Sequence, residues 1–250
     1  MSDFGDDELE RYARHIVLKE IGGSGQARLK AAHVAVIGAG GIGSPALQYL
    51  AAAGIGRLTV IDDDKVDLSN LQRQTLFGDG DIGAPKVDAA ARALHRLNPH
   101  VTVMPVETRI DPVNAAKLLA NADVILDGCD NFATRLAVSD AAQALCIPLV
   151  SAAVGQFEGQ LAVFRGWEAG KPCYRCLVGG DPDRAEASCA EAGVMGALTG
   201  TIGSLAALEV IRALVPFGSD PAGRLLIADT LDWRFRTLTL TKDSACTCAG

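Results

Sequence analysis

Up to residue 152, short apolar runs alternate with longer stretches of helical periodicity. Apolar runs bounded by glycine or polar residues predict buried strands of a parallel sheet. The runs lie at 34–37, 58–61, 101–106, 123–127 and 147–152. Helices are predicted at 6–18, 44–54, from about 86 to 97, at 111–120 and at 132–145, with a loop at 22–25. This order predicts an α/β fold with a Rossmann-like, doubly wound, mostly parallel sheet.

Beyond residue 152 the pattern changes. Residues 154–164 predict two short strands around Glu158 and Gly159, and 225–229 and 235–241 predict two final strands. The sheet is therefore expected to continue into antiparallel strands. The apolar stretch 194–217, with a helix predicted at 197–214, carries Glu209 and Arg212. It predicts a buried helix rather than a membrane span.

Charge narrows the possible partners. The formal net charge is −7, from 23 Lys and Arg against 30 Asp and Glu. A nucleic acid as the main partner is disfavoured, because phosphate backbones need a basic face. Residues 1–11 are acidic and polar and do not resemble a secretory signal. We expect a cytoplasmic protein without a membrane partner.

Three glycines follow the first predicted strand. Gly38, Gly40 and Gly43 have the G-x-G-x-x-G spacing. The first two let backbone approach phosphate oxygens, and the third lets the helix pack on the strand. Asp62 follows the second strand, about 20 residues beyond the last glycine, where a carboxylate can bind ribose hydroxyls. The glycines predict a nucleotide site without saying which nucleotide binds there, so a nicotinamide dehydrogenase is the first alternative.

Polar residues follow the second strand, at the edge where ligands of open α/β sheets bind. Asn70, Arg73 and Gln74 lie in this segment and can reach phosphates, although an ordinary polar loop has the same composition. Lys86 lies at the positive end of a predicted helix, where a cation is locally unfavourable. Lys86 either neutralises an anion or is a surface residue without a functional role.

A second polar cluster follows the fourth strand. Asp130 lies in this cluster and can hold magnesium, a hard cation that prefers oxygen ligands. It can also cap the helix predicted at 132–145, and the two roles are compatible.

The seven cysteines of a chain without a signal peptide indicate thiols or metal ligands rather than disulfides. Cys173 and Cys176 have metal-ligand spacing, and together with Cys246 and Cys248 they fit a structural zinc site. A redox-active Cys-x-x-Cys is the alternative. Cys189, in a polar loop, is either a reactive thiol or inert. The remaining cysteines, Cys129 and Cys146, are predicted to be core residues.

The order of these motifs resembles the MoeB/ThiF/HesA branch of the ubiquitin-activating-enzyme superfamily over nearly the whole chain. The resemblance begins at Arg11-Tyr-Ala-Arg-His15 and continues through the glycine turn and Asp62-Asp-Asp64. Its most specific motifs are Ser69-Asn-Leu-Gln-Arg-Gln74 and Asp130-Asn-Phe-Ala-Thr-Arg135. It ends at Cys189-Ala-Glu-Ala-Gly-Val-Met195 and the two cysteine pairs. One departure is Cys246-Thr-Cys248, where the family has Cys-x-x-Cys.

This resemblance implies ATP-dependent adenylation of the C-terminal Gly-Gly carboxylate of a ubiquitin-like sulfur carrier, with release of pyrophosphate. It assigns Gly41 to the phosphates, Asp62 to the ribose, and Asp130 to magnesium. Asn70, Arg73 and Lys86 are implied to hold phosphate oxygens. The same motifs make Gly38, Gly40, Gly43, Asp64, Gln74 and Asn131 nucleotide-binding candidates.

The resemblance also implies a homodimer. Helical periodicity alone places Arg14 on a solvated face, whereas in the family this arginine reaches into the neighbouring subunit's site. The resemblance further implies that Cys173, Cys176, Cys246 and Cys248 bind zinc, and that Cys189 matches a cysteine that bonds to the carrier in ThiF-type members.

Within the branch, length and motifs resemble the MoeB type, the molybdopterin-synthase adenylyltransferases, most. A MoaD-like carrier is thus expected, and a ThiS-like carrier of thiamine biosynthesis is the alternative. Other functions considered are an NAD-dependent oxidoreductase and a non-catalytic adaptor. We expect one adenylyltransferase domain over 1–250, not fused to a sulfurtransferase. Its expected parts are N-terminal helices (1–32), a nucleotide-binding core (33–152), and an extension with antiparallel strands, crossover loop and zinc site (153–250).

Overall fold

The computed structural model describes residues 4–179 and 193–246. Its described strands form one sheet in the order β3-β2-β1-β4-β5-β6-β7-β8. The strands are β1 (His33–Ile37), β2 (Arg57–Ile61), β3 (Thr102–Val106), β4 (Val124–Asp127), β5 (Leu149–Val154), β6 (Glu158–Phe164), β7 (Arg224–Asp229) and β8 (Arg234–Thr239). Neighbours from β3 to β5 pair in parallel, and those from β5 to β8 pair antiparallel. The predicted Rossmann-like sheet with an antiparallel continuation is confirmed.

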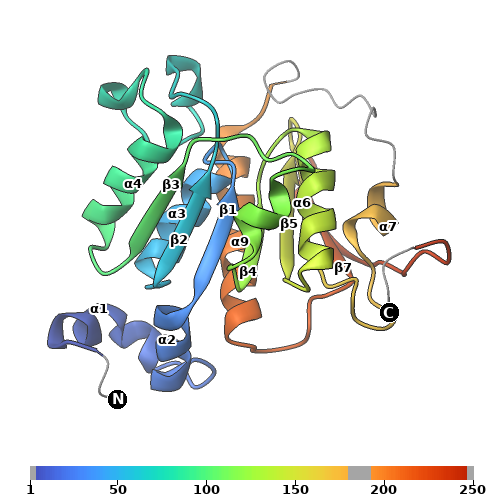
Figure 1. Cartoon of the computed structure of the whole chain (residues 1–250), viewed down its shortest axis with the longest axis horizontal. Helices are drawn as coiled ribbons and strands as arrows, with labels where there is room; N and C mark the ends of the chain where they lie inside the picture. Colours follow the sequence, from blue (N-terminus) through green and yellow to red (C-terminus); the bar gives the residue numbers. More distant parts are fainter. Residues whose placement is uncertain (1–3, 180–192, 247–250) are drawn as a thin grey trace.

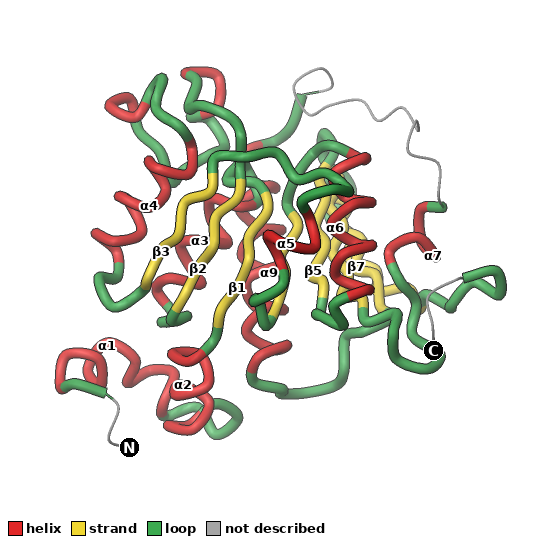
Figure 2. Tube along the Cα trace, in the orientation of Figure 1, coloured by secondary structure: helices red, strands yellow, loops and turns green. Residues whose placement is uncertain are grey.

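Helices cover both faces of this sheet (Figures 1 and 2). The helices among the described residues are α1 (Asp6–Ile16), α2 (Gly22–Ala31), α3 (Gly43–Ala52), α4 (Lys86–Leu97), α5 (Ala115–Leu119), α6 (Phe132–Ala144), α7 (Tyr174–Val178) and α9 (Gly196–Leu214). Two 3₁₀ turns add Leu68–Asn70 and Asp79–Asp81. One apolar core joins the sheet to α3, α4 and α9, and a second joins it to α5, α6 and α7.

Helix α9 is the one helix in the described residues that is long and apolar enough to cross a membrane. Ile202, Ala206 and Val210 recur at helical spacing and are almost completely buried against the sheet and α3. This packing explains its apolar sequence and agrees with the prediction of a buried helix.

Three local predictions are wrong. Residues 22–25 lie within α2 rather than in a loop; a side chain at Gly25 would lie 3.0 Å from Val215, so tight packing requires glycine in a helix that propensity disfavours. Helix α5 is shorter than 111–120, because the Asp111 carboxylate accepts the N–H groups of Val113 and Asn114 and makes a turn there.

The third error concerns 154–164, which form the end of β5 and one strand, β6. The turn precedes Glu158, and Gly159 lies inside β6. Glycine is needed at this position because a Cβ would lie 2.5 Å from the side chain of Ile202. A glycine that signals a turn in sequence here marks a close approach of helix α9.

Candidate active site

The carboxyl ends of the central strands are level. Ile37 of β1 pairs with both Ile61 of β2 and Asp127 of β4, so the turns after these three strands emerge side by side. A cavity of about 640 Å³ opens there and extends to the start of α9. The predicted nucleotide-binding residues that line it are Gly38, Gly40, Gly41, Asp62, Asp64, Asn70, Arg73, Gln74, Lys86, Asp130 and Asn131.

The glycine turn forms one wall. Gly38 has φ +85°, a backbone conformation that favours glycine, and a Cβ at Gly43 would lie 1.9 Å from the carbonyl oxygen of Gly38. Gly43 therefore lets α3 pack against the end of β1, away from the cavity. At Gly40 the nearest atom to a built Cβ is the Gln74 amide nitrogen, at 3.7 Å. The space beside Gly40 is thus open to a ligand.

Asp62 faces this turn. One carboxylate oxygen accepts the N–H of Ala39 at 2.7 Å, and the other accepts the N–H of Asp64 at 2.8 Å. Burial raises the pKa of the Asp62 carboxyl, while nearby Lys86 and the two N–H groups favour the charged form. The carboxylate is held rigidly at the end of β2, where a ribose would lie in this type of fold.

Lys86 is 4% exposed, and its Nζ lies 2.7 Å from Oδ2 of Asp64. A buried ammonium needs an anionic partner, and Asp64 supplies one. Lys86 is thus a buried, paired cation rather than a surface residue.

The segment after Asp67 makes the rim. Asn70 accepts the N–H of Asp67 at 3.3 Å, and Arg73 donates to the carbonyl of Ser69 at 3.0 Å. Gln74 is 4% exposed, and its Oε1 is buried without a hydrogen-bond partner in the part of the chain that the structure describes. A polar group left unpaired beside a cavity is one that a ligand can satisfy.

The helix-capping role that sequence left open for Asp130 belongs to its neighbour, Asn131. The N-cap of α6 is Asn131, whose Oδ1 accepts the N–H of Thr134 at 2.9 Å. The capping alternative for Asp130 is therefore wrong. The Asp130 carboxylate is exposed at the cavity and has no hydrogen-bond or ion-pair partner among the described residues. By contrast, Asp63 and Asp64 are paired with Arg109 and Lys86.

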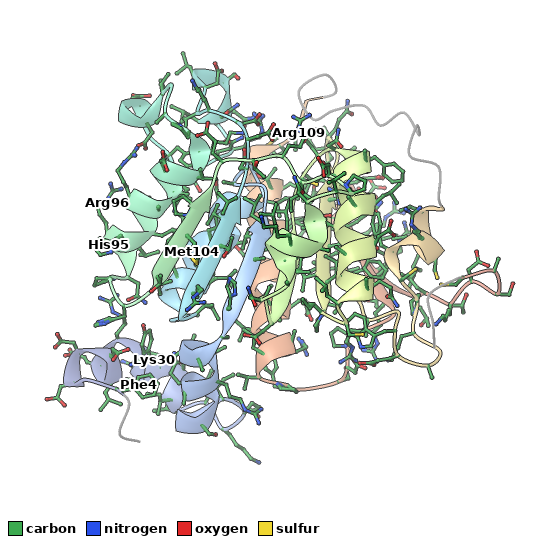
Figure 3. The ribbon with its side chains drawn as sticks, viewed as in Figure 1. Phe4, Lys30, His95, Arg96, Met104 and Arg109 are labelled. Carbon is green, nitrogen blue, oxygen red and sulfur yellow. The ribbon has the colours of Figure 1, made fainter. Side chains whose placement is uncertain are left out.

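Arg14 does not reach this cavity. It is exposed on α1, and the N-terminal helices lie at the opposite end of the sheet from Arg109, which lines the cavity (Figures 1 and 3). Helix α1 is fixed to the body, because buried Tyr12 accepts a hydrogen bond from Asn98 at 2.8 Å. Arg14 cannot serve the site of its own chain in this arrangement.

Three cysteines meet far from the cavity. The sulfur of Cys173 lies 3.7 Å from those of both Cys176 and Cys246, and all three sulfurs lie within 4.8 Å of one another. Thiolates at about 2.3 Å from a tetrahedral zinc ion are about 3.8 Å apart, so this spacing fits zinc. Cys248 and Cys189 lie outside the described residues.

Of the two cysteines predicted to be core residues, Cys146 is not in the core and Cys129 lies at the cavity. Cys146 is exposed with φ +54°, at the end of α6, because the chain turns there before β5. Cys129 is half-buried and lines the cavity. Burial raises the pKa of the Cys129 thiol well above its usual value, and Asp127 adds to this effect, so the thiol stays protonated.

Sequence reasoning missed several lining residues, namely Thr108, Arg135, Glu158, Gln160 and Thr199. Arg135 ends the motif Asp130-Asn-Phe-Ala-Thr-Arg135, but the sequence assigned no function to this arginine. Thr199 is on apolar α9, where nothing in the local sequence points to a ligand.

The chain matches a model of the ThiF family over residues 12–248. It belongs to the ThiF family. This ThiF-family protein is 46% identical over 249 residues to the sulfur carrier protein adenylyltransferase of Thermus thermophilus, covering 98% of this chain and 92% of the relative. It is 43% identical over 250 residues to the molybdopterin-synthase adenylyltransferase of Escherichia coli, covering 100% of both chains. The resemblance recognised in the sequence is confirmed.

Solved structures agree on the fold of this ThiF-family chain. A crystal structure of Escherichia coli MccB with ATP superposes with a TM-score of 0.80 at 22% sequence identity, covering 96% of this chain and 74% of MccB. At that identity the likeness supports the Rossmann-like architecture.

Proposed function

We propose that this protein is an adenylyltransferase that uses ATP and magnesium to join AMP to the C-terminal Gly-Gly carboxylate of a ubiquitin-like sulfur carrier, releasing pyrophosphate. The observation that carries the proposal is the cavity, where cationic side chains surround a glycine turn together with the Asp130 carboxylate, which no described residue pairs with. The names of the full-length relatives from Thermus thermophilus and Escherichia coli support this activity.

The reaction needs charge neutralisation more than bond-making groups. The carrier carboxylate attacks the α-phosphate, and negative charge spreads over the phosphate oxygens as pyrophosphate leaves. Lys86 and Arg73 bind these oxygens, with help from the amide of Asn70. Gly40 and Gly41 let the chain backbone approach the phosphates, and Asp62 orients the ribose. Asp130 holds magnesium, which neutralises phosphate charge when it is bound.

The carrier is MoaD-like in this proposal. The name of the Escherichia coli relative, aligned over the full length of both chains, favours a molybdopterin pathway. The name of the Thermus thermophilus relative specifies only a sulfur carrier. A ThiS-like carrier is therefore the second candidate.

The site is completed by a second copy of the chain. Arg14 is exposed without a partner among the described residues, and exposed Val17 and Leu18 follow it. An exposed arginine beside apolar residues, remote from its own cavity, fits a role in the cavity of a homodimer partner. Cys173, Cys176, Cys246 and Cys248 hold a structural zinc ion, which ties the C-terminal segment to α7.

The test is pyrophosphate release from ATP and magnesium by the purified full chain, with MoaD-like and ThiS-like carriers of the source organism added separately. We expect carrier-dependent release with the MoaD-like protein. Release only with the ThiS-like protein would move the enzyme to the thiamine pathway. Saturable NADH binding without ATP binding would overturn the proposal.

A further inference from the structure

A buried ion pair lies beneath the segment that carries Asp130. Asp127 is 1% and Arg135 5% exposed, and Arg135 Nη1 lies 3.8 Å from Asp127 Oδ2. Burying two charges costs free energy that their mutual attraction offsets only in part. Apolar residues would fill this space at least as favourably, so stability alone does not explain the pair.

The pair binds the backbone immediately before Asp130 from both sides. Asp127 accepts the N–H of Cys129 at 3.1 Å, and Arg135 Nη2 donates to the carbonyl of the same residue. The same Nη2 donates to the carbonyl of Ala152 on β5 at 3.0 Å. The segment is thereby attached to two strands at the cavity edge.

The glycine turn restrains the segment from the other direction. A Cβ built on Gly38 would lie 3.3 Å from the nitrogen and Cα of Cys129, so these two backbones are in close contact. On the far side of Asp130, Asn131 is fixed by its cap on α6. Both neighbours of Asp130 are held, while its own carboxylate has no partner among the described residues.

We infer that Arg135 is a positioning residue for the adenylation reaction, which fixes the backbone at Cys129 so that Asp130 presents its carboxylate to magnesium without reorganisation. This inference rests on the proposed function. It explains why the planar fork of an arginine is present, because one guanidinium reaches two carbonyl groups and a carboxylate together. A residue that orients a metal ligand typically changes metal affinity about 10-fold or more when it is replaced.

The experiment compares Arg135→Lys and Arg135→Ala with wild type in the full chain. Lysine keeps a cation near Asp127 but cannot contact both carbonyls with a planar fork. The readouts are the magnesium concentration that half-saturates ATP-induced thermal stabilisation, the same midpoint for pyrophosphate release, and the KM for ATP at saturating magnesium. We expect both midpoints to rise about tenfold in Arg135→Ala and less in Arg135→Lys, with a nearly constant KM.

Leu136→Ala is the matched control, because Leu136 is a neighbouring buried residue of α6 that does not line the cavity. It should lower Tm without moving the magnesium midpoints. An equal shift in Leu136→Ala, or no shift in Arg135→Lys and Arg135→Ala, would overturn the inference.

Asp130→Ala separates this inference from the proposed function. If Asp130→Ala leaves the magnesium midpoints unchanged, the assignment of magnesium to Asp130 fails, and the inference fails with it. If Asp130→Ala shifts them, we expect no additional shift when Arg135→Lys is added. Additive shifts would mean that Arg135 acts independently of Asp130, which contradicts the inference alone.

Discussion

Lys86 and Asp64 are joined twice, by the 2.7 Å ion pair and by a 2.9 Å hydrogen bond from the backbone N–H of Lys86 to the carbonyl of Asp64. The ammonium is buried, whereas the Asp64 side chain is 60% exposed. The Asp64 carboxylate thus neutralises a cation that lines the cavity. A phosphate entering the cavity offers that cation a second partner.

We expect Asp64→Asn to lower the free energy of unfolding by about 1–2 kcal/mol without nucleotide, because it removes the nearest anion from a buried ammonium. Saturating magnesium and ATP should reduce this loss, since phosphate then neutralises Lys86. Urea unfolding with and without nucleotide measures both values. Asp63→Asn is the control, because the Asp63 carboxylate pairs with exposed Arg109. An equal loss under both conditions would contradict contact between Lys86 and phosphate.

Alanine at two glycines of one motif should change different properties, namely stability at Gly43 and ATP affinity at Gly40. Gly43→Ala places a Cβ 1.9 Å from a carbonyl oxygen, so we expect a loss of about 3 kcal/mol or more in unfolding free energy. Gly40→Ala meets nothing closer than 3.7 Å and should change stability by less than about 1 kcal/mol. Its added methyl group occupies ligand space, so ATP affinity should fall about tenfold, or about 1.4 kcal/mol. Denaturant unfolding and calorimetric ATP titration test the pair.

Most of the sheet could be predicted from the sequence because its strands are short apolar runs with glycine or polar residues at their ends. The position of the site could be predicted for a related reason, because the polar residues that follow β2 and β4 lie at the same edge of the sheet. The elements around Gly25 and Gly159 were predicted wrongly, because glycine is needed there for close packing against Val215 and Ile202, which are far away in the sequence. Thr199 was missed on the same ground: it reaches the cavity through the packing of α9, which no local pattern encodes.

The raised pKa of Asp62 gives a pH dependence. The folded protein retains the Asp62 proton to higher pH than the unfolded chain does, so the free energy of unfolding falls as pH rises from the ordinary Asp value through the raised one. Asp62→Asn removes this contribution. The Tm of the variant relative to wild type should therefore increase with pH across that window, without nucleotide. Asp63→Asn controls for the loss of one negative charge, and a parallel change in both variants would contradict the assignment to Asp62.

Metal analysis tests the cysteine cluster. We expect about one zinc ion per chain, a much lower content in Cys176→Ser, and unchanged content in Cys146→Ser, because Cys146 is exposed and outside the cluster. Loss of the metal should lower Tm by roughly 5–10 °C while ATP still binds, since the cluster is not part of the cavity lining. A zinc-free wild type with full stability would contradict a structural metal.

Mixing two inactive variants tests the role of Arg14. We expect Arg14→Ala and Asp130→Ala each to lose most activity. If Arg14 acts in the partner's cavity, each mixed dimer contains one site with both changes and one site with neither. Random exchange of subunits should then restore about a quarter of wild-type activity. No recovery, despite subunit exchange detected by mass spectrometry, would place Arg14 outside the partner's site.

The cavity is lined by residues from Ile37 in β1 to Thr199 in α9. Its walls come from the glycine turn, the segment after β2, the ends of β4 and β5, and the first turn of the last helix. A nucleotide bound there is in effect a non-covalent crosslink between sequence-distant segments. ATP should therefore slow amide hydrogen exchange in β5 and α9 as well as around the glycine turn, and ligand occupancy and protection of the whole sheet would rise together.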